Sequence, residues 1–213
     1  MKNKKSLIDN GYKFVHIEGM DLSGKSTLVK NFVADSKQKW CIRNKILTDN
    51  NPIWNFANDL RKKGIYDEEV FNNLYFAAAL ADVSSYERKD ENVIQDSIIA
   101  LRSLSYAKYL NNHRTADAFL ELLKKHPKPT HSIYLYADIP TRNERLKKRI
   151  SERPNEVTAG DRTITSNIQK FEEIEKLLRK FSIENFTSHV INTSKLSEYE
   201  VLNNAKEIIG GNL

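Results

Sequence analysis

Residues 19–26, Gly-Met-Asp-Leu-Ser-Gly-Lys-Ser, fit the pattern G-x-x-x-x-G-K-[ST]. They follow the apolar run 14–17 and precede a helix-like stretch at 27–33. In such a loop the glycines let backbone N–H groups converge on phosphate oxygens, and the new helix points its positive end at them. Lys25 adds a mobile cation, and the hydroxyl of Ser26 suits Mg²⁺. The segment is therefore predicted to be a phosphate-binding loop, or P-loop, for a nucleoside triphosphate.

The simpler alternative is a glycine turn that joins a strand to a helix and leaves Lys25 in solvent. The match at every fixed position, with a strand before and a helix after, favours phosphate binding. ATP is the expected triphosphate, with Mg²⁺ as its metal. The residues expected to bind it are Gly19, Asp21, Leu22, Ser23, Gly24, Lys25, Ser26 and Thr27.

The segment from Arg142 to Arg153 is the one dense basic stretch of the chain. On a helix, Arg142, Arg145 and Arg149 share a face at three- and four-residue offsets, whereas Lys147 and Lys148 point elsewhere. A closing lid of this kind would stabilise charge on a transferred phosphoryl group and exclude water. The alternative is a solvated basic face in a chain with 34 Lys and Arg residues. We predict a lid at about 142–162, with phosphate contacts from Arg145, Arg149 and Arg153.

Composition limits the class of protein. The chain has 213 residues, 39% of them hydrophobic, and is most simply one domain over 1–213. Its net charge of +6 suits phosphorylated small molecules, and the spread of its basic residues does not predict nucleic acid binding. One cysteine, no signal peptide and no long apolar span predict a soluble cytoplasmic protein without membrane contact. Residues 1–11 are predicted to be a flexible leader.

Strand-like and helix-like segments alternate along the chain. Strands are expected at 12–17, 45–48, 92–96, 131–137 and 190–192. Helices are expected at 26–36, 53–63, 103–110, 116–125, 141–150, 167–181 and 197–209, with a long one opening at 67. This order predicts a three-layer α/β fold, a parallel five-stranded sheet with helices on both faces. Ligands then bind at the carboxyl ends of the strands, where Glu18, Asp49, Asp96 and Asp138 fall.

Residues 14–28 resemble the opening of thymidylate kinases, which share a Glu-Gly-x-Asp stretch leading into Gly-Lys-[Ser/Thr]-Thr. Residues 74–79 resemble their long substrate helix, and 93–96 their strand ending in Asp. Residues 133–140, with the arginines that follow, resemble their Leu-Asp-x-Pro strand and basic lid helix. Order and spacing agree over about residues 12–210. The resemblance implies a P-loop NTPase fold and an ATP-dependent nucleotide kinase that phosphorylates a nucleoside monophosphate such as dTMP, with a homodimer as a family-level expectation.

The chain departs from this family on the substrate side. Asp96 is followed by Ser97 where the family carries an arginine, and Arg102 comes six residues after that Asp. Leu80 stands at the position of the family's phosphate-gripping arginine, and residues 49–52 replace its Pro-Gly-Gly segment. A nucleoside or a different small metabolite is therefore an alternative acceptor. A regulatory nucleotide-binding ATPase is a third reading.

Site roles follow from the motif and the resemblance together. Asp96 is expected to support Mg²⁺ beside Ser26, directly or through water. The resemblance places Asp21 near the transferred phosphoryl group, although a loop-stabilising Asx turn would also explain it. Aromatic residues near the acceptor could stack on a flat ring or simply fill the core. The predicted acceptor-side residues are Asp49, Trp54, Arg61, Tyr75, Phe76, Asp96 and Arg102.

Overall fold

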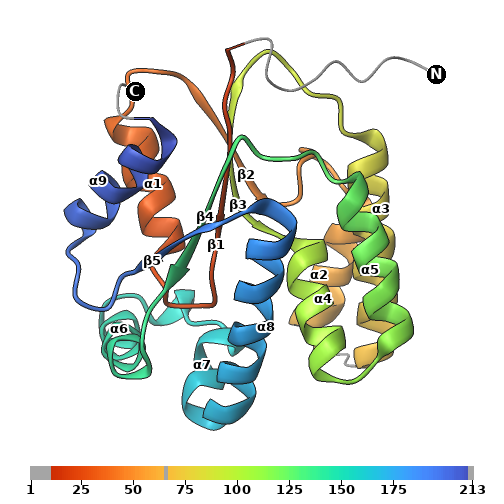
Figure 1. Cartoon of the computed structure of the whole chain (residues 1–213). Coiled ribbons are helices and arrows are strands. Elements are labelled where there is room, and N and C mark those ends of the chain that lie inside the picture. Colours follow the sequence, from red (N-terminus) through yellow and green to blue (C-terminus); the bar gives the residue numbers. More distant parts are fainter. Residues whose placement is uncertain (1–10, 65–66, 211–213) are drawn as a thin grey trace.

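The computed structural model describes residues 11–64 and 67–210. Within these ranges, five strands form one parallel sheet in the order β2-β3-β1-β4-β5 (Figure 1). The strands are β1 (Phe14–Glu18), β2 (Trp40–Lys45), β3 (Asn92–Ile98), β4 (His131–Tyr136) and β5 (His189–Asn192). The predicted leader, apart from Gly11, lies outside the described residues.

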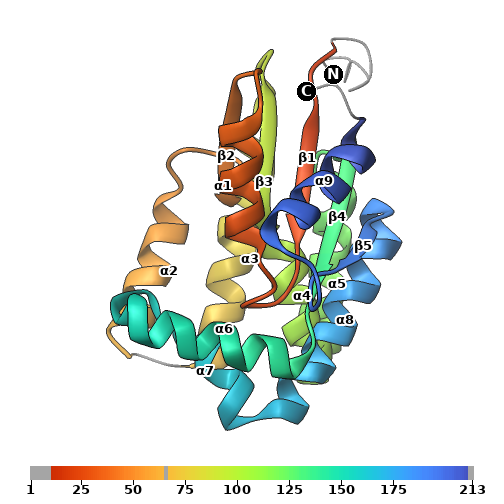
Figure 2. The same ribbon diagram turned by 90° about the vertical axis from the view of Figure 1, so that its left-hand side faces the viewer.

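Helices cover both faces of this sheet. In the described residues they are α1 (Lys25–Asp35), α2 (Pro52–Lys62), α3 (Glu68–Ser85), α4 (Ile99–Tyr109), α5 (His113–Lys125), α6 (Ile139–Glu152), α7 (Ala159–Ser166), α8 (Ile168–Phe186) and α9 (Glu198–Ile209), with a 3₁₀ turn at Pro154–Glu156. Helices α1 and α9 lie on one face, and α3, α4, α5 and α8 lie on the other (Figure 1). Helix α6 crosses the end of the sheet below the P-loop (Figure 2). The predicted three-layer α/β fold is confirmed.

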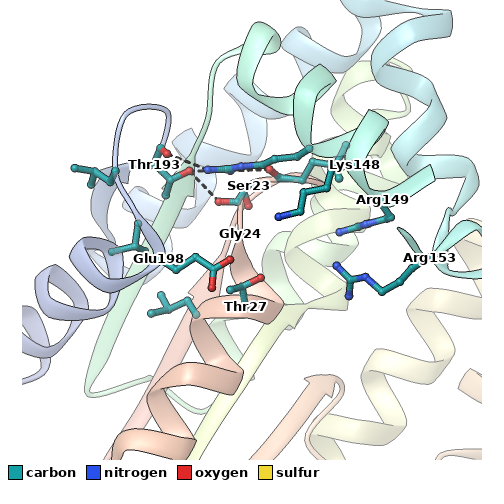
Figure 3. A pocket seen from close by; sticks show the side chains of 13 residues that line it. Ser23, Gly24, Thr27, Lys148, Arg149, Arg153, Thr193 and Glu198 are labelled. Carbon is teal, nitrogen blue, oxygen red and sulfur yellow. Dashed lines mark hydrogen bonds between the residues drawn. The ribbon is translucent and has the colours of Figure 1, made fainter. Parts of the chain in front are cut away.

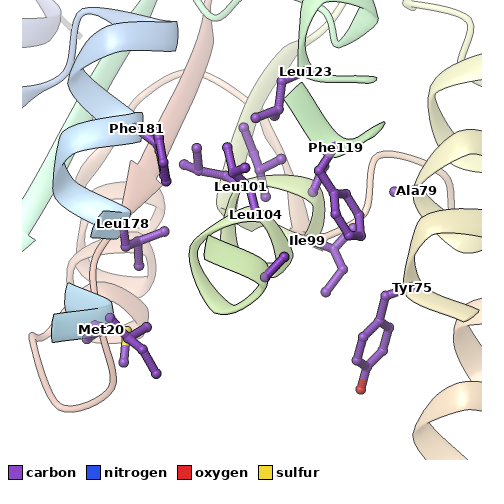
Figure 4. Packing of buried hydrophobic residues seen from close by; sticks show 14 of the residues in the cluster. Met20, Tyr75, Ala79, Ile99, Leu101, Leu104, Phe119, Leu123, Leu178 and Phe181 are labelled. Atoms are coloured by element: carbon purple, nitrogen blue, oxygen red, sulfur yellow. The ribbon is translucent and has the colours of Figure 1, made fainter. Parts of the chain in front are cut away.

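The central strand β1 separates two hydrophobic cores. Val15 and Ile17 pack with Leu28 and Phe32 of α1 on one face. On the other face, side chains from α4, α5 and α8 converge on one another, among them Leu101, Leu104, Phe119, Leu178 and Phe181 (Figure 4). β1 is buried along its whole length, and its buried side chains include the polar His16 and Glu18. Packing on both faces fixes the end of β1, and with it the start of the P-loop.

Side-chain caps set several helix starts that the sequence indicated. Asp67 accepts a hydrogen bond from the backbone N–H of Val70, and Asp138 accepts one from that of Thr141. Ser197 and Glu200 form a reciprocal capping box at the start of α9. These caps satisfy N–H groups that have no partner within the helix. Asp138 therefore serves as the cap of α6 rather than as a free carboxylate at the end of β4.

The second strand does not lie where the sequence predicted it. We expected 45–48, but β2 spans Trp40–Lys45. Ile46 and Leu47 are buried in a bend, because the Asp82 carboxylate accepts hydrogen bonds from the backbone N–H groups of Leu47 and Thr48. A short apolar run held by a distant carboxylate looks like a buried strand in sequence. The true β2 is an edge strand with exposed residues such as Ile42, so its pattern is weak.

Smaller differences concern helices, and α8 for example ends at Phe186, five residues after the predicted end. Helix α4 begins at Ile99, four residues before the predicted start, directly after β3 ends. Helix α7 and the 3₁₀ turn before it fall in the predicted lid, where no helix beyond 150 was expected. In the part of the chain that the structure describes, no helix is long and apolar enough to cross a lipid bilayer.

Candidate active site

The P-loop backbone adopts conformations that favour glycine. Gly19 has φ +149°, and a Cβ there would lie 2.3 Å from the carbonyl oxygen of Leu135. Gly24 has φ +97° at the N-cap of α1 and makes no side-chain cap hydrogen bond. No capping side chain therefore accepts a hydrogen bond from the first N–H groups of α1. These groups lie at the positive end of the helix dipole, next to the loop. This is the backbone geometry of an anion-binding site.

Lys25 is the cation of this loop. Its side chain is buried, and its Nζ donates to the carbonyl oxygen of Met20 at 3.2 Å. Burial lowers the pKa of Lys25, and the nearby Arg102 guanidinium lowers it further. Among the described residues, no carboxylate oxygen lies within 4.0 Å of this ammonium. A buried cation without a protein counter-ion, next to free N–H groups, is suited to a phosphate.

Two side-chain oxygens of the kind that binds metal ions lie next to each other beside the loop. Ser26, in the first turn of α1, donates from Oγ to Oδ2 of Asp96 at 3.0 Å. Hydroxyl and carboxylate oxygens suit Mg²⁺, which needs few protein ligands when it also binds phosphate and water. The pair fits the metal expected from the sequence. No group of three or more His, Cys, Asp or Glu side chains within 11–64 and 67–210 could form a metal site without such partners.

A pocket of about 290 Å³ opens on one side of the P-loop, between α1, α6 and α9 (Figure 3). Its lining includes Ser23, Gly24 and Thr27 of the loop and α1. Arg145 also lines it and donates to the carbonyl oxygens of Leu22 and Thr193, each at 2.9 Å. Arg145 therefore ties the P-loop to the loop after β5. We call this hollow, which is lined by basic residues of α6, the donor-side pocket.

Three further cations of α6 line this pocket. The side chains of Lys148, Arg149 and Arg153 extend from α6 toward Gly24 and Thr27 (Figure 3). Arg149 pairs with the buried Asp161 at 2.8 Å, and Arg153 pairs with Glu156. The expectation that Lys148 points elsewhere is therefore wrong. Lys148 follows Arg145 by three residues in α6 and so shares its face, which the three- and four-residue spacing already implied.

Arg142 is not part of the basic face over the pocket. Its side chain is fully buried and forms an ion pair with Glu175 of α8. Its Nε donates to the carbonyl oxygen of Ala137 at 2.6 Å, and its Nη1 donates to that of Asp21 at 2.5 Å. The guanidinium plane also lies 4.9 Å from the centre of the Phe171 ring. Arg142 is a structural brace between β4, α8 and the P-loop, which corrects the expectation that it faces a triphosphate.

The opposite side of the P-loop holds a second ionic cluster. Arg102 of α4 lies 3.3 Å from Oδ1 of Asp21 and 3.7 Å from Oε1 of Glu18. Burial raises the pKa of Glu18, but its His16 neighbour and the Arg102 charge outweigh burial and hold it at about 2. Burial also acts against ionisation of Asp21, and the charges of Arg102 and Lys25 bring its pKa below the ordinary value. Both carboxylates are therefore ionised at neutral pH.

Ser97 completes this cluster in an unusual conformation. It has φ +68°, and Glu18 accepts hydrogen bonds from its Oγ at 3.0 Å and from the backbone N–H of Ile98 at 3.1 Å. Arg102 donates to the same Ser97 Oγ at 3.3 Å. Glu18 thus holds the turn from β3 into α4 in a left-handed geometry that a non-glycine residue adopts at a cost. This turn directs Arg102 back toward the P-loop.

The predicted acceptor-side aromatic residues separate into two groups. Trp54 and Tyr75 lie with ring centres 5.6 Å apart, and Arg61 donates to the Tyr75 hydroxyl at 3.4 Å. Phe76 instead packs edge-on against Phe119 of α5, inside the core. The first group joins α2 to α3, with Tyr75 buried, whereas Phe76 joins α3 to α5.

Asp49 does not join the P-loop residues. It forms an ion pair with Arg43 and lies in a separate hollow of about 210 Å³, whose lining contains no P-loop residue. The bend at 46–48 turns the chain away from the site, and so the position after a strand was a poor guide here. The polar donor-side residues that sequence reasoning missed are Lys148, Thr193 and Glu198. Only the pattern of a strand followed by a capped helix at 193–197 could have pointed to Thr193.

Comparison with known proteins places this geometry in a family. The model of the thymidylate kinase family matches residues 17–204. A search of curated proteins found no match. Among solved structures, a thymidylate kinase from Candida albicans aligns with TM-score 0.66 and 17% identity, over 93% of this chain and 91% of that one. A deoxyadenosine kinase from M. mycoides aligns with TM-score 0.57 and 17% identity, over 92% and 97%.

A shikimate kinase from Acinetobacter baumannii aligns with TM-score 0.52 and 15% identity, over 94% of each chain. These solved structures share the fold, and their identities are too low to transfer a substrate. The family match covers most of the chain and includes the P-loop, Asp96, Arg102 and the basic helix α6. The chain belongs to the thymidylate kinase family and is an ATP-dependent nucleotide kinase.

Proposed function

We propose that the protein transfers the γ-phosphoryl group of ATP to a nucleoside monophosphate such as dTMP. The observation that carries this proposal is the position of the P-loop between two charged sites. The donor-side pocket, with Arg145 and Lys148, lies on one side of the loop. Arg102, paired with Asp21, lies on the other. A loop with one charged site on each side can hold a triphosphate and a second anionic substrate in line.

The donor half of the reaction needs positioning and charge neutralisation. In our proposal the loop amides and Lys25 hold the β- and γ-phosphates, and Arg145, Arg149 and Arg153 line the path of the triphosphate. Ser26 and Asp96 would hold Mg²⁺, which would supply positive charge to neutralise the phosphates. Segment 142–162 would close over ATP and exclude water, which limits wasteful hydrolysis.

The acceptor half uses the cluster around Arg102. Arg102 would hold an anionic acceptor, and Asp21 would orient the acceptor next to the γ-phosphoryl group. Trp54 and Tyr75 supply flat apolar surfaces near a base. Because Asp21 is already ionised, it can accept a hydrogen bond from the acceptor without first losing a proton.

ADP release with Mg-ATP and a panel of monophosphates and nucleosides tests this function. We expect turnover that depends on a nucleoside monophosphate, with dTMP among the best acceptors. Lys25→Ala should reduce kcat by roughly 10³-fold or more, because it removes the positive charge that stabilises the phosphoryl group in the transition state of transfer. Lys30→Ala, on the exposed face of the same helix, is the matched control and should keep wild-type activity. ADP release that no acceptor accelerates would contradict the proposal.

A nucleoside acceptor is the second candidate. Ser97 stands where the family carries an arginine, and Leu80 stands at a second such position and is exposed. Fewer arginines at the acceptor would reduce the advantage of a charged substrate. In this case thymidine or deoxyadenosine would give a higher kcat/KM than the corresponding monophosphate in the same assay.

A further inference from the structure

The end of β2 contains a strained turn centred on Lys45. Lys45 has φ +63°, and the backbone N–H of Ile46 donates to the carbonyl oxygen of Asn44 at 2.8 Å. This is a γ-turn of positive φ, which is rare and strained. The pairing of β2 with β3 also shifts register between Asn44 and Lys45. Such irregularities are frequent next to active sites, where they redirect a side chain.

Contacts from α3 hold this turn in place. The Asp82 carboxylate, nearly fully buried, accepts from the backbone N–H of Leu47 at 2.8 Å and from that of Thr48 at 2.8 Å. The hydroxyl of Thr48 donates to the same carboxylate at 2.7 Å. Strained residues persist only where the surrounding structure determines their conformation. Asp82 supplies this constraint and fixes where the Lys45 side chain can lie.

The Lys45 side chain lies on the acceptor side of the P-loop. Its Nζ is 5.8 Å from the centre of the Trp54 ring. Burial lowers the pKa of Lys45, and the Arg102 charge lowers it further, whereas Asp21 acts in the opposite direction. Within the described residues, no carboxylate oxygen comes within 4.0 Å of this ammonium. Lys45 is thus a partly buried cation with an aromatic neighbour and without a protein counter-ion.

Arg102 is the other cation on the acceptor side of the P-loop, and unlike Lys45 it has carboxylate partners. Arg102 lies within 4.0 Å of both Asp21 and Glu18, so two carboxylates already balance its charge. The charge of Lys45 has no such balance, which is costly in a partly buried position. An anionic ligand between Lys45 and Arg102 would remove this cost. The strained backbone at Lys45 and the unbalanced charge of its side chain both fit a binding site for an anionic ligand.

We propose that Lys45 is a specificity-determining residue that binds the anionic group of the acceptor, and that it makes the enzyme select a monophosphate over the corresponding nucleoside. This inference rests on the proposed function and assigns one residue to the choice between its two acceptor classes. It also explains how a chain with Ser97 at the family's arginine position can retain a charged acceptor. The positive charge comes from β2 instead of from the turn after β3.

Steady-state kinetics with dTMP, thymidine and Mg-ATP test the assignment. Lys45→Met removes the ammonium and keeps the stem that packs near Trp54. We expect a tenfold to hundredfold rise in the KM for dTMP, the range of roughly one charge-assisted hydrogen bond, with little change in the KM for ATP. Lys45→Arg should recover most of the lost affinity. Lys39→Met, at an exposed position just before the opposite end of β2, should behave as the wild type.

A second comparison separates the strained backbone from the missing charge. Lys45→Gly and Lys45→Ala both remove the ammonium, but only glycine adopts φ +63° without strain. Both variants should show the same raised KM for dTMP, and Lys45→Gly should unfold at the higher urea concentration. A fold defect would lower kcat and raise both KM values together. Equal or reversed urea midpoints would overturn the strain argument.

The outcomes distinguish this inference from the function on which it rests. If the wild type shows no acceptor-dependent ADP release, the proposed function and this assignment fall together. If dTMP is phosphorylated and Lys45→Met leaves its KM unchanged, the proposed function stands and the role of Lys45 is refuted. If thymidine matches dTMP in kcat/KM for the wild type, selection by charge is also refuted.

Discussion

The hydroxyl of Ser26 and the carboxylate of Asp96 lie 3.0 Å apart, although 70 residues separate them in the chain. Ser26 belongs to the first turn of α1, and Asp96 lies near the carboxyl end of β3. Parallel pairing of β1 with β3, which places Ile17 opposite Asp96, brings the two oxygen atoms together. The P-loop and the expected metal ligand are therefore positioned by one strand pair.

Removal of the Asp96 charge should weaken the binding of Mg²⁺ at the active site. Asp96→Asn keeps the shape of the side chain but loses a carboxylate ligand, so the Mg²⁺ concentration for half-maximal turnover should rise about tenfold or more. Titration of Mg²⁺ in the ADP-release assay measures this shift. Asp117→Asn, at an exposed position on α5, is the control. An unchanged Mg²⁺ dependence would exclude Asp96 as a ligand, direct or through water.

Arg145 should support ATP binding through the P-loop. Arg145→Ala removes the hydrogen bonds to the carbonyl oxygens of Leu22 and Thr193, and it removes one cation from the lining of the donor-side pocket. We expect the KM for ATP to rise about tenfold or more, with a smaller effect on the acceptor KM. Lys147→Ala, on the exposed side of the same helix, should leave both constants unchanged. If the two substitutions change the KM for ATP equally, Arg145 has no specific role in ATP binding.

The buried pair of Arg142 and Glu175 should matter for stability. Glu175→Ala would leave the fully buried Arg142 guanidinium without its counter-ion, at a cost of about 3–5 kcal/mol in the free energy of unfolding. Glu175→Gln should cost less, because an amide oxygen can still accept a hydrogen bond. Urea unfolding measures both. Glu172→Ala, at an exposed position on the same helix, is the control. If Glu175→Ala lowers the free energy of unfolding by no more than Glu172→Ala does, the structural role of the Arg142–Glu175 pair is contradicted.

His126 should make the fold sensitive to mild acid. Burial lowers the pKa of His126 to about 3 from 6.5, although its hydrogen bond to the Pro127 carbonyl oxygen opposes the shift. Because the unfolded chain binds the proton more readily, stability is lost as the pH falls below 6.5 toward 3. One and a half pH units below 6.5 correspond to about 2 kcal/mol.

This effect is measured as the change in the free energy of unfolding between pH 7 and pH 5. His126→Gln removes the titrating ring, so the variant should lose less stability over this interval than the wild type, whatever its stability at pH 7. His113→Gln, at the exposed start of α5, should keep the wild-type slope. Parallel slopes for all three proteins would show that His126 does not titrate with unfolding.

The sequence by itself determined the P-loop, the alternation of strands and helices, and the basic helix expected at 141–150. These features are local: glycines at 19 and 24, Lys25 and the apolar run before them are adjacent in the chain, and helical periodicity needs only neighbouring residues. The three-layer fold followed, because parallel strands with intervening helices have few topologies.

Tertiary structure decided what lies far apart in the chain. The buried bend at 46–48 depends on Asp82 of α3, so β2 could not be located from its own residues. Arg142 and Arg145 share a helix face, but Glu175 of α8 buries the first and Thr193 holds the second at the pocket. Likewise, the charge of Arg102 is balanced by Asp21 and Glu18, and that of Lys45 is not. Such ion pairs form only when the sheet brings separate elements together, because the burial of a side chain and its counter-ion depend on residues that are distant in the sequence.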